Sequence, residues 1–178
     1  MPEFKVHNLW PIPVYDSKIP VKQKWKDFVI NLEYDRTHIN NSDISKDRYI
    51  LNNMPELKAK IEKHCEHYVR KYLTIKSNAQ FYLLNSWSNI HCPGEYSQIH
   101  CHANSIISGV YYPIFPKKSG GLYLHKSWNY KNLIDQNIML DFEEYNYITA
   151  SKYLLDIEEG TIVMFPSHLD HSVDTNRS

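Results

Sequence analysis

From residue 80 onward the chain is a series of short apolar segments with clear breaks between them. The segments are rich in aromatic and β-branched residues, and Pro, Gly, Asn or Glu-Glu-Gly separates them. This pattern is typical of short strands. We expect strands at residues 81–91, 105–115, 121–125, 151–157 and 161–165. Residues 126–150 show no clear period, and we interpret them as an excursion between strands.

The N-terminal part of the chain has a different periodicity. Apolar residues recur at helical spacing in residues 20–34 and again from Pro55 to about Leu73, so we expect two helices. Pro55 fits the first turn of the second helix. Residues 9–15 hold two prolines and are expected to form an edge or lead-in strand. The polar residues 40–47 are expected to form a surface loop.

Two helices followed by many short strands predict a mainly β fold with flanking helices, built as a closed barrel or as two packed sheets. The 178 residues are enough for one hydrophobic core and too few for two comfortable domains. We therefore expect one domain over residues 1–178, with a helical part at about 20–75 and a β core at about 80–178.

Charge and composition exclude several classes of partner. Lysine plus arginine equals aspartate plus glutamate at 20 each, so no net field favours a nucleic acid or a membrane surface. No segment approaches the roughly 18 apolar residues that would span a bilayer, and the start is not a secretory signal. Three cysteines without a CxxC pair argue against a disulfide framework, so we expect a cytoplasmic protein.

The most informative motif is a His-x-His sequence at His100 and His102. If residues 100–112 are extended, the period of two places both histidines, Ser108 and Tyr112 on one face. Two imidazoles on the inner face of a sheet can point at one metal ion. The alternative is a pair of surface histidines beside a turn.

A second segment, residues 158–173, combines a turn, an apolar strand that ends in Phe-Pro, and a histidine. His171 is the candidate third ligand, and spacing alone does not exclude His168. Asp170 and Asp174 are possible carboxylate ligands, although Asp170 would face away from His171 in an extended segment. Neutral imidazole suits iron, zinc, copper or nickel, so these residues do not choose the metal.

Several stretches resemble the 2-oxoglutarate- and iron(II)-dependent oxygenases that are common in bacteriophages and marine bacteria and are related in fold to prolyl hydroxylases. The resemblance covers nearly the whole chain in order, and its most specific part is the block with His-x-His and Ser-Gly-Val-Tyr-Tyr. The matching stretches are LWPIPVY (9–15), SWSNIHCPGEYSQIHCHANSIISGVYYP (86–113), SGGLYLH (119–125) and EEGTIVMFPSHLDHSVDTNRS (158–178).

This resemblance implies a double-stranded β-helix, or jelly roll, in which His100, His102 and His171 hold Fe(II). It also implies 2-oxoglutarate as cosubstrate and O2 as oxidant. Decarboxylation of 2-oxoglutarate to succinate and carbon dioxide would accompany hydroxylation of a C–H bond in a further substrate. The hydrophobic walls of the site would keep water away from the oxidising centre.

Two features depart from the pattern of this superfamily. Its usual ligands are two histidines and one carboxylate, and here His102 stands where the carboxylate is expected. An arginine or lysine on the strand after the last histidine normally holds the far carboxylate of 2-oxoglutarate. The sequence stops at Ser178 before such a strand, and Arg177 is only six residues beyond His171. We therefore expect a missing C-terminal strand and assign no such role to Arg177.

Further residues are candidates for cosubstrate binding. His91 stands where related hydroxylases often place a tyrosine that binds the cosubstrate. Ser108 and Tyr112 would face the site and could hydrogen-bond the cosubstrate, although core packing also explains them. Cys92 and Cys101 could join the histidines in a structural zinc site, but their spacing matches no common zinc pattern.

Two other functions compete with a 2-oxoglutarate-dependent hydroxylase. The first is a jelly-roll binding or structural module that keeps the fold without turnover. The second is a three-histidine, cupin-like dioxygenase that needs no 2-oxoglutarate. Two further histidines, His64 and His67, lie on the expected second helix and are interpreted as solvated.

Overall fold

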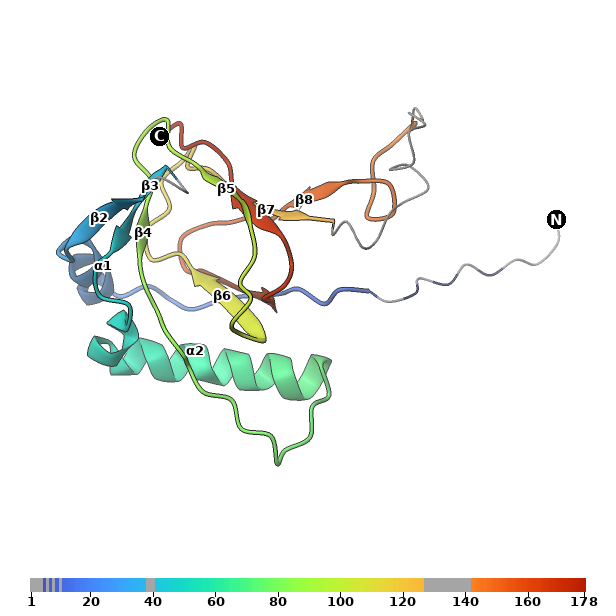
Figure 1. Ribbon diagram of the computed structural model, residues 1–178, viewed down its shortest axis with the longest axis horizontal. Helices are drawn as coiled ribbons and strands as arrows, with labels where there is room; N and C mark the ends of the chain where they lie inside the picture. The colour runs from blue at the N-terminus through green and yellow to red at the C-terminus, as the bar shows by residue number, and fades with distance from the viewer. Residues whose placement is uncertain (1–4, 6, 8, 10, 38–40, 127–141) are drawn as a thin grey trace.

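The computed structural model describes residues 5, 7, 9, 11–37, 41–126 and 142–178 (Figure 1). Its strands are β1 (Tyr15–Lys18), β2 (Tyr34–Thr37), β3 (Ser42–Ser45), β4 (Asn89–Ile90), β5 (Ser97–His100), β6 (Ile107–Tyr111), β7 (Leu122–His125), β8 (Lys152–Leu154), β9 (Thr161–Pro166) and β10 (His171–Val173). Its helices are α1 (Gln23–Ile30), the 3₁₀ turn η1 (Ile50–Asn53), α2 (Pro55–His67) and the π-helical turn η2 (Tyr68–Tyr72).

The central sheet has the strand order β1-β9-β6, and both strand pairs are antiparallel. Its middle strand, β9, is buried along almost its whole length. Ile162 and Met164 pack with the helices, whereas Val163 and Phe165 belong to a separate core on the opposite side. A strand covered on both faces needs a continuous apolar run. Residues 161–165 form such a run, so the sequence predicted this strand correctly.

A second sheet has the strand order β5-β10-β7-β8 and packs against the open face of the central sheet. The core between the two sheets contains Leu122 and Leu124 from β7 together with Val163 and Phe165 from β9. This packing places β5 and β10 opposite the central sheet.

The two helices cover the other face of the central sheet (Figure 1). Trp25 of α1 and Leu57 of α2 are almost fully buried there, beside Ile162 and Met164. The Tyr68 hydroxyl, at the end of α2, donates a hydrogen bond to the carbonyl of Pro13 at 2.7 Å. The predicted helices are confirmed, although α1 is shorter than residues 20–34 and the second helix widens into a π turn after His67.

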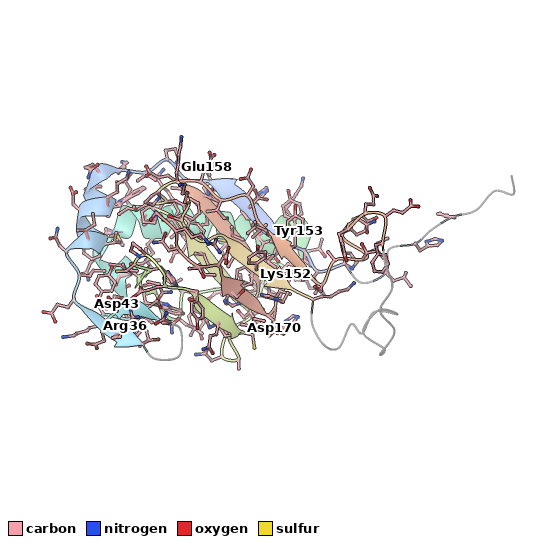
Figure 2. The ribbon with its side chains drawn as sticks, turned by 90° about the horizontal axis from the view of Figure 1, so that it is seen from above. Arg36, Asp43, Lys152, Tyr153, Glu158 and Asp170 are labelled. Atoms are coloured by element: carbon pink, nitrogen blue, oxygen red, sulfur yellow. The ribbon has the colours of Figure 1, made fainter. Side chains whose placement is uncertain are left out.

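A third, small sheet has the order β2-β3-β4, and it corrects the prediction of a loop at residues 40–47. Ser42 and Ser45 are buried in β3, which pairs with strands on both sides. A strand whose buried positions are serines carries no apolar alternation, so its sequence resembles a loop. Arg36 and Asp43 lie side by side on this sheet, with 3.4 Å between guanidinium and carboxylate (Figure 2).

Three other strand predictions need correction. The N-terminal strand is Tyr15–Lys18 and not 9–15, because the prolines of the earlier segment cannot donate to a ladder. Residues 81–91 contain only the two-residue β4, since Ser86 exchanges backbone hydrogen bonds with Arg48 and Ile50 around η1. Residues 171–173 form a strand, β10, that the sequence pattern did not reveal.

The described part of the chain is thus mainly β with helices on one side, as the sequence predicted, and its two facing sheets are compatible with a jelly roll. No pairing between described strands joins these two sheets into a closed barrel. Of the predicted excursion at 126–150, residues 127–141 lie outside the described residues, and residues 142–150 form turns. None of the described helices is long and apolar enough to cross a membrane.

Candidate metal centre

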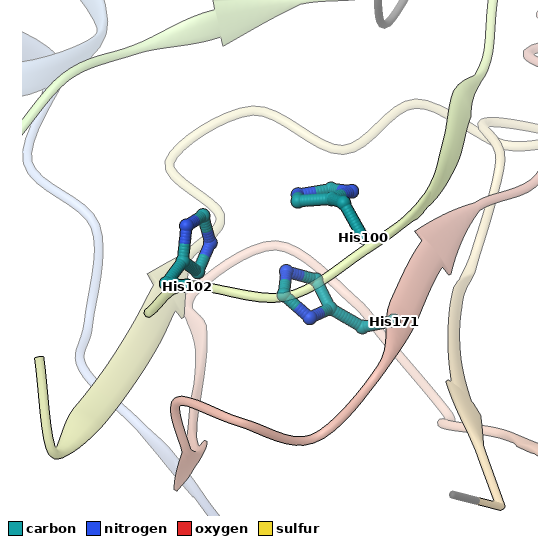
Figure 3. Close-up of side chains that lie close together, drawn as sticks. All are labelled: His100, His102 and His171. Atoms are coloured by element: carbon teal, nitrogen blue, oxygen red, sulfur yellow. The ribbon is translucent and has the colours of Figure 1, made fainter. Parts of the chain in front are cut away.

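Three histidines from different parts of the chain meet at one end of the space between the two sheets. His100, His102 and His171 each offer one ring nitrogen, and these nitrogens all lie within 4.8 Å of one another (Figure 3). The ring centroids are 4.3 Å apart for His100 and His171, 5.1 Å for His102 and His171, and 5.2 Å for His100 and His102. The geometry therefore brings together the three histidines that the sequence singled out.

Strand pairing holds two of these histidines side by side. His100 is the last residue of β5 and His171 is the first residue of β10, and the two are direct partners in the antiparallel register. Their side chains therefore lie on the same face of the sheet. A register irregularity between His171 and Val173 lets Ser97, three residues before His100, pair with Val173.

The third histidine, His102, lies in the turn that follows β5. Its backbone N–H donates to the carbonyl of Ser167 at 2.8 Å, and Ser167 itself lies in the turn that leads from β9 to β10. The Ser167 N–H donates to the carbonyl of Ile106 at 3.0 Å. The two turns that carry His102 and lead to His171 are therefore joined through one residue.

Ser167 is a supporting residue that sequence reasoning missed. Its side chain is fully buried, and its hydroxyl forms hydrogen bonds of 2.8 Å with the hydroxyls of Ser105 and Ser108. These bonds attach the turn after His102 to β6 and to the end of β9. The sequence offers no signal for this role, because a serine after a Phe-Pro strand end is usually a surface turn residue.

Backbone carbonyls fix the orientation of two of the imidazoles. The Nδ1 atom of His100 lies 2.8 Å from the carbonyl oxygen of Gln98, and Nδ1 of His171 lies 2.9 Å from that of Leu169. A carbonyl oxygen can only accept, so both Nδ1 atoms carry the hydrogen and both Nε2 lone pairs stay available. Metal-binding histidines commonly have this outer hydrogen bond, which sets the tautomer and the ring angle.

Burial favours the neutral form of two histidines of the cluster, because it lowers the pKa of each. His171 is only 4% exposed, and burial is the main cause that lowers its pKa to about 4. The neighbouring His100 and His102 lower this pKa further. Burial, followed by His100, also lowers the pKa of His102. Neutral imidazole is the form that binds a metal ion, so both shifts favour ligation at neutral pH.

Ser108 and Tyr112 face the space between the sheets. Contrary to the prediction, they do not lie on the strand that carries His100. Residues 100–112 are not one extended strand, because the chain turns after His100 and β6 belongs to the central sheet. The face shared by Ser108 and Tyr112 is nevertheless the one that packs toward the second sheet. Tyr112 packs in the core between the sheets and its ring contacts Phe115, and burial raises its pKa.

His91 lies outside the three-histidine cluster, next to the far end of β5. Its Nε2 atom is 2.9 Å from the hydroxyl of Ser97, and its carbonyl accepts a hydrogen bond from the Asn176 side chain at 2.7 Å. Burial lowers the pKa of His91. Ser97 pairs with Val173 and His100 pairs with His171, with a register irregularity between the two pairs, so His91 is linked to the same strand as His100.

The other candidates do not join the cluster. In the described part of the chain, the group of possible metal ligands contains only the three histidines and no carboxylate or thiolate. His168 is exposed, and the carboxylate of Asp174 is paired with Arg177 at 3.1 Å. Cys92 and Cys101 are exposed and free. The position that a carboxylate usually fills thus belongs to an imidazole.

The fold and this cluster together define a β protein with a candidate mononuclear, three-histidine metal site between two facing sheets. Residues 85–178, more than half of the chain, match the model of a family described as "putative 2OG-Fe(II) oxygenase". The chain belongs to this family, as its motifs predicted, and all three histidines lie inside the matched segment. The comparison with curated proteins gave no match.

Proposed function

We propose that the chain is an Fe(II)- and 2-oxoglutarate-dependent oxygenase that hydroxylates a C–H bond, with iron held by His100, His102 and His171. The observation that carries this proposal is the three-histidine cluster within the family segment. The double-stranded β-helix is the fold that the family implies for the two facing sheets, and we include it in the proposal.

The donor set fits a divalent transition metal. Two of the three imidazoles present Nε2 lone pairs that hydrogen bonding leaves free, and neutral nitrogen donors suit iron(II). Three neutral ligands leave more positive charge on the site than the usual two histidines and one carboxylate. When bound, iron(II) and 2-oxoglutarate supply the chemistry by which O2 hydroxylates a substrate while 2-oxoglutarate becomes succinate and carbon dioxide.

Aromatic side chains of the chain shield the cluster from water. The Phe165 ring lies edge-on against His171, with centroids 4.9 Å apart, and Trp87 lies edge-on against His102 at 5.8 Å. These rings restrict the open side of the cluster, so that solvent and substrates approach from fewer directions. Their contacts also hold the imidazole planes in place.

His91, Ser108 and Tyr112 stay our candidates for cosubstrate binding. Ser108 and Tyr112 face the space between the sheets, and the Tyr112 hydroxyl is a neutral donor at any physiological pH because burial raises its pKa. His91 is held by Ser97, which lies on the same strand, β5, as His100. Each of these groups can donate a hydrogen bond to a carboxylate of 2-oxoglutarate.

The test is succinate release from 2-oxoglutarate in the presence of iron(II) and oxygen. We expect release by the unaltered chain, and loss of both release and bound iron in His100→Ala and His171→Ala. His168→Ala is the matched control, because His168 is exposed and lies three residues from His171 outside the cluster. Equal iron content in His171→Ala and His168→Ala would refute the ligand set.

A dioxygenase that needs no 2-oxoglutarate is the second candidate, favoured by the lack of a carboxylate in the cluster among the described residues. Oxygen consumption separates the two functions, provided that candidate substrates are supplied. Uptake that depends on added 2-oxoglutarate supports the first function, whereas uptake without it supports the second.

A further inference from the structure

A hollow of about 390 Å³ lies between β1 and α2, whereas the metal centre lies on β5, β10 and the turn after β5. Nearly all of its polar lining residues are basic. The polar lining residues are Tyr15 and five basic residues, Lys18, Lys60, Lys63, His64 and His67. The chain as a whole has equal numbers of basic and acidic residues, so the accumulation of positive charge here is local.

Two of these lysines have no acidic partner in the described part of the chain. Lys18 forms an ion pair with Glu158 and donates to the Thr161 hydroxyl at 2.8 Å, so its charge is neutralised. The side chains of Lys60 and Lys63 take part in none of the ion pairs or hydrogen bonds among the described residues. Two positive charges on α2 therefore remain uncompensated beside the hollow.

Two of the three acidic residues on α2 are already paired, and the third, Glu62, does not line the hollow. Glu56 binds both Lys22 and Lys24 of the α1 region, and these contacts lower its pKa to about 2. Glu66 binds Arg70 at 2.7 Å, one helical turn further on. Neither carboxylate is thus available to neutralise the lysines at the hollow.

Two histidines, His64 and His67, also line the hollow. His64 Nδ1 and the Tyr15 hydroxyl are 2.7 Å apart, and the Tyr15 ring lies 5.9 Å from the His64 ring and 6.1 Å from the His67 ring. Burial lowers the pKa of His64, and the charges of His67, Lys63 and Lys60 lower it further. The hollow is lined by three lysines and by no carboxylate, so its lining carries net positive charge. The sequence-based interpretation of both histidines as simply solvated is therefore incomplete.

We propose that this hollow binds the phosphate group of a small phosphomonoester. A phosphomonoester carries close to two negative charges at pH 7, which matches the two uncompensated lysines. Lysine is a compact point charge that suits phosphate, whereas a planar carboxylate is better matched by the fork of arginine, and no arginine lines the hollow. The volume is large enough for a small organic group beside the phosphate.

This site does not depend on the proposed oxygenase activity. Its lining residues fall between residues 15 and 67, outside the segment 85–178 that matches the family. The two sites also lie on different elements, so each can be tested while the other is intact.

The experiment is a titration with inorganic phosphate, followed by NMR of the histidine ring protons. His64→Gln and His67→Gln identify the two signals. We expect saturable shifts of both signals with phosphate, and smaller, non-saturating changes with acetate or chloride at equal ionic strength. Lys60→Gln/Lys63→Gln should weaken phosphate binding by about tenfold or more, because charge-assisted contacts are lost.

The control is Lys58→Gln/Lys117→Gln, which removes two positive charges outside the hollow and should bind phosphate as the unaltered chain does. None of the four lysines is buried, so melting temperatures should agree among the variants. The proposal is overturned if phosphate gives no saturable shift, if acetate binds as tightly, or if the Lys60→Gln/Lys63→Gln variant binds as well as its control.

Discussion

His102 differs from the other two histidines of the cluster because it lies in a turn and not in a strand. Its ring is held by the contact with Trp87, and its backbone is held by Ser167. The superfamily normally has a carboxylate at this vertex. The shorter side chain of aspartate can occupy the same turn, since the backbone contact to Ser167 does not involve the side chain.

We therefore expect His102→Asp to keep a metal site, with a ligand set of two histidines and one carboxylate. Iron content after dialysis, measured beside His102→Ala, checks this expectation. His102→Asp should bind iron more tightly than His102→Ala. Loss of all metal from a folded His102→Asp chain would show that His102 is not at that vertex.

Ser167→Ala tests whether the buried hydroxyl supports the site. The change removes hydrogen bonds to Ser105 and Ser108 within a fully buried setting, which costs roughly 1–3 kcal/mol of unfolding free energy. We expect a lower melting temperature and weaker iron binding. The exposed Ser77→Ala is the control for both measurements. Iron affinity that stays unchanged in Ser167→Ala would show that the turn does not position His102.

At this scale, the sequence pointed to His100, His102 and His171 but left His168 open as the third ligand, and the resemblance to the oxygenase family implied the full set. The hydrogen bonds that set their tautomers could not be predicted. Both acceptors are backbone carbonyls, of Gln98 and Leu169, and any residue type at those positions would provide them. The sequence left Asp170 and Asp174 open as carboxylate ligands, and the structure leaves both outside the cluster. The role of Ser167 could not be predicted either, because it depends on the meeting of two turns.

At the scale of elements, strand β10 is held from both sides and continues into the C-terminal residues. The Asp174 N–H donates to the Gly121 carbonyl at 3.0 Å, and the backbone of Asn176 exchanges hydrogen bonds with Gly94 and Glu95. Gly120 lies directly against this segment: a Cβ atom built there would be 1.8 Å from the Asp174 carbonyl oxygen. Glycine is thus required for the close approach of the two backbones.

Gly120→Ala should therefore push the segment after β10 away from the start of β7. We expect a loss of unfolding free energy of at least about 1–3 kcal/mol, typical of overpacking, measured by urea denaturation. The neighbouring Ser119→Ala is the matched control and should change stability little. A Gly120→Ala chain as stable as Ser119→Ala would contradict the described packing.

Strands could be predicted where burial forces an apolar pattern and were missed where it does not. β9 is buried on both faces and reads as Thr-Ile-Val-Met-Phe. β3 and β10 are short, and polar side chains occupy much of their length, so neither alternates clearly. Each also pairs with a strand far away in the sequence, β4 for β3 and β5 and β7 for β10, which no local pattern records.

At the scale of the whole molecule, the packing of two sheets buries His171, the most enclosed of the three candidate ligands. The pairing of His100 with His171 joins positions 71 residues apart (171 − 100), and it follows from sheet topology that the sequence alone did not specify. The helical layer on the other face leaves the basic hollow between β1 and α2 at a separate surface.

Burial of His171 predicts a pH dependence of stability for the metal-free chain. Its pKa is about 4 in the folded chain and about 6.5 in an unfolded one, so between these values the unfolded chain binds more protons. The contribution is therefore fully present above pH 6.5 and is lost as pH falls toward 4. Urea denaturation of chelator-treated protein at several pH values should show this decline. A His171→Gln chain with the same decline would refute the assignment to His171.

We propose that the three histidines hold iron(II) in a site that also accepts 2-oxoglutarate. Anaerobic titration with iron(II) and then 2-oxoglutarate tests it most directly, because the bidentate complex of the two has a weak visible charge-transfer band. We predict one iron per chain, a band that saturates on addition of 2-oxoglutarate, and loss of both in His171→Ala but not in His168→Ala. Iron that binds without any band would contradict the use of 2-oxoglutarate, and a chain that binds no iron would contradict the metal centre itself.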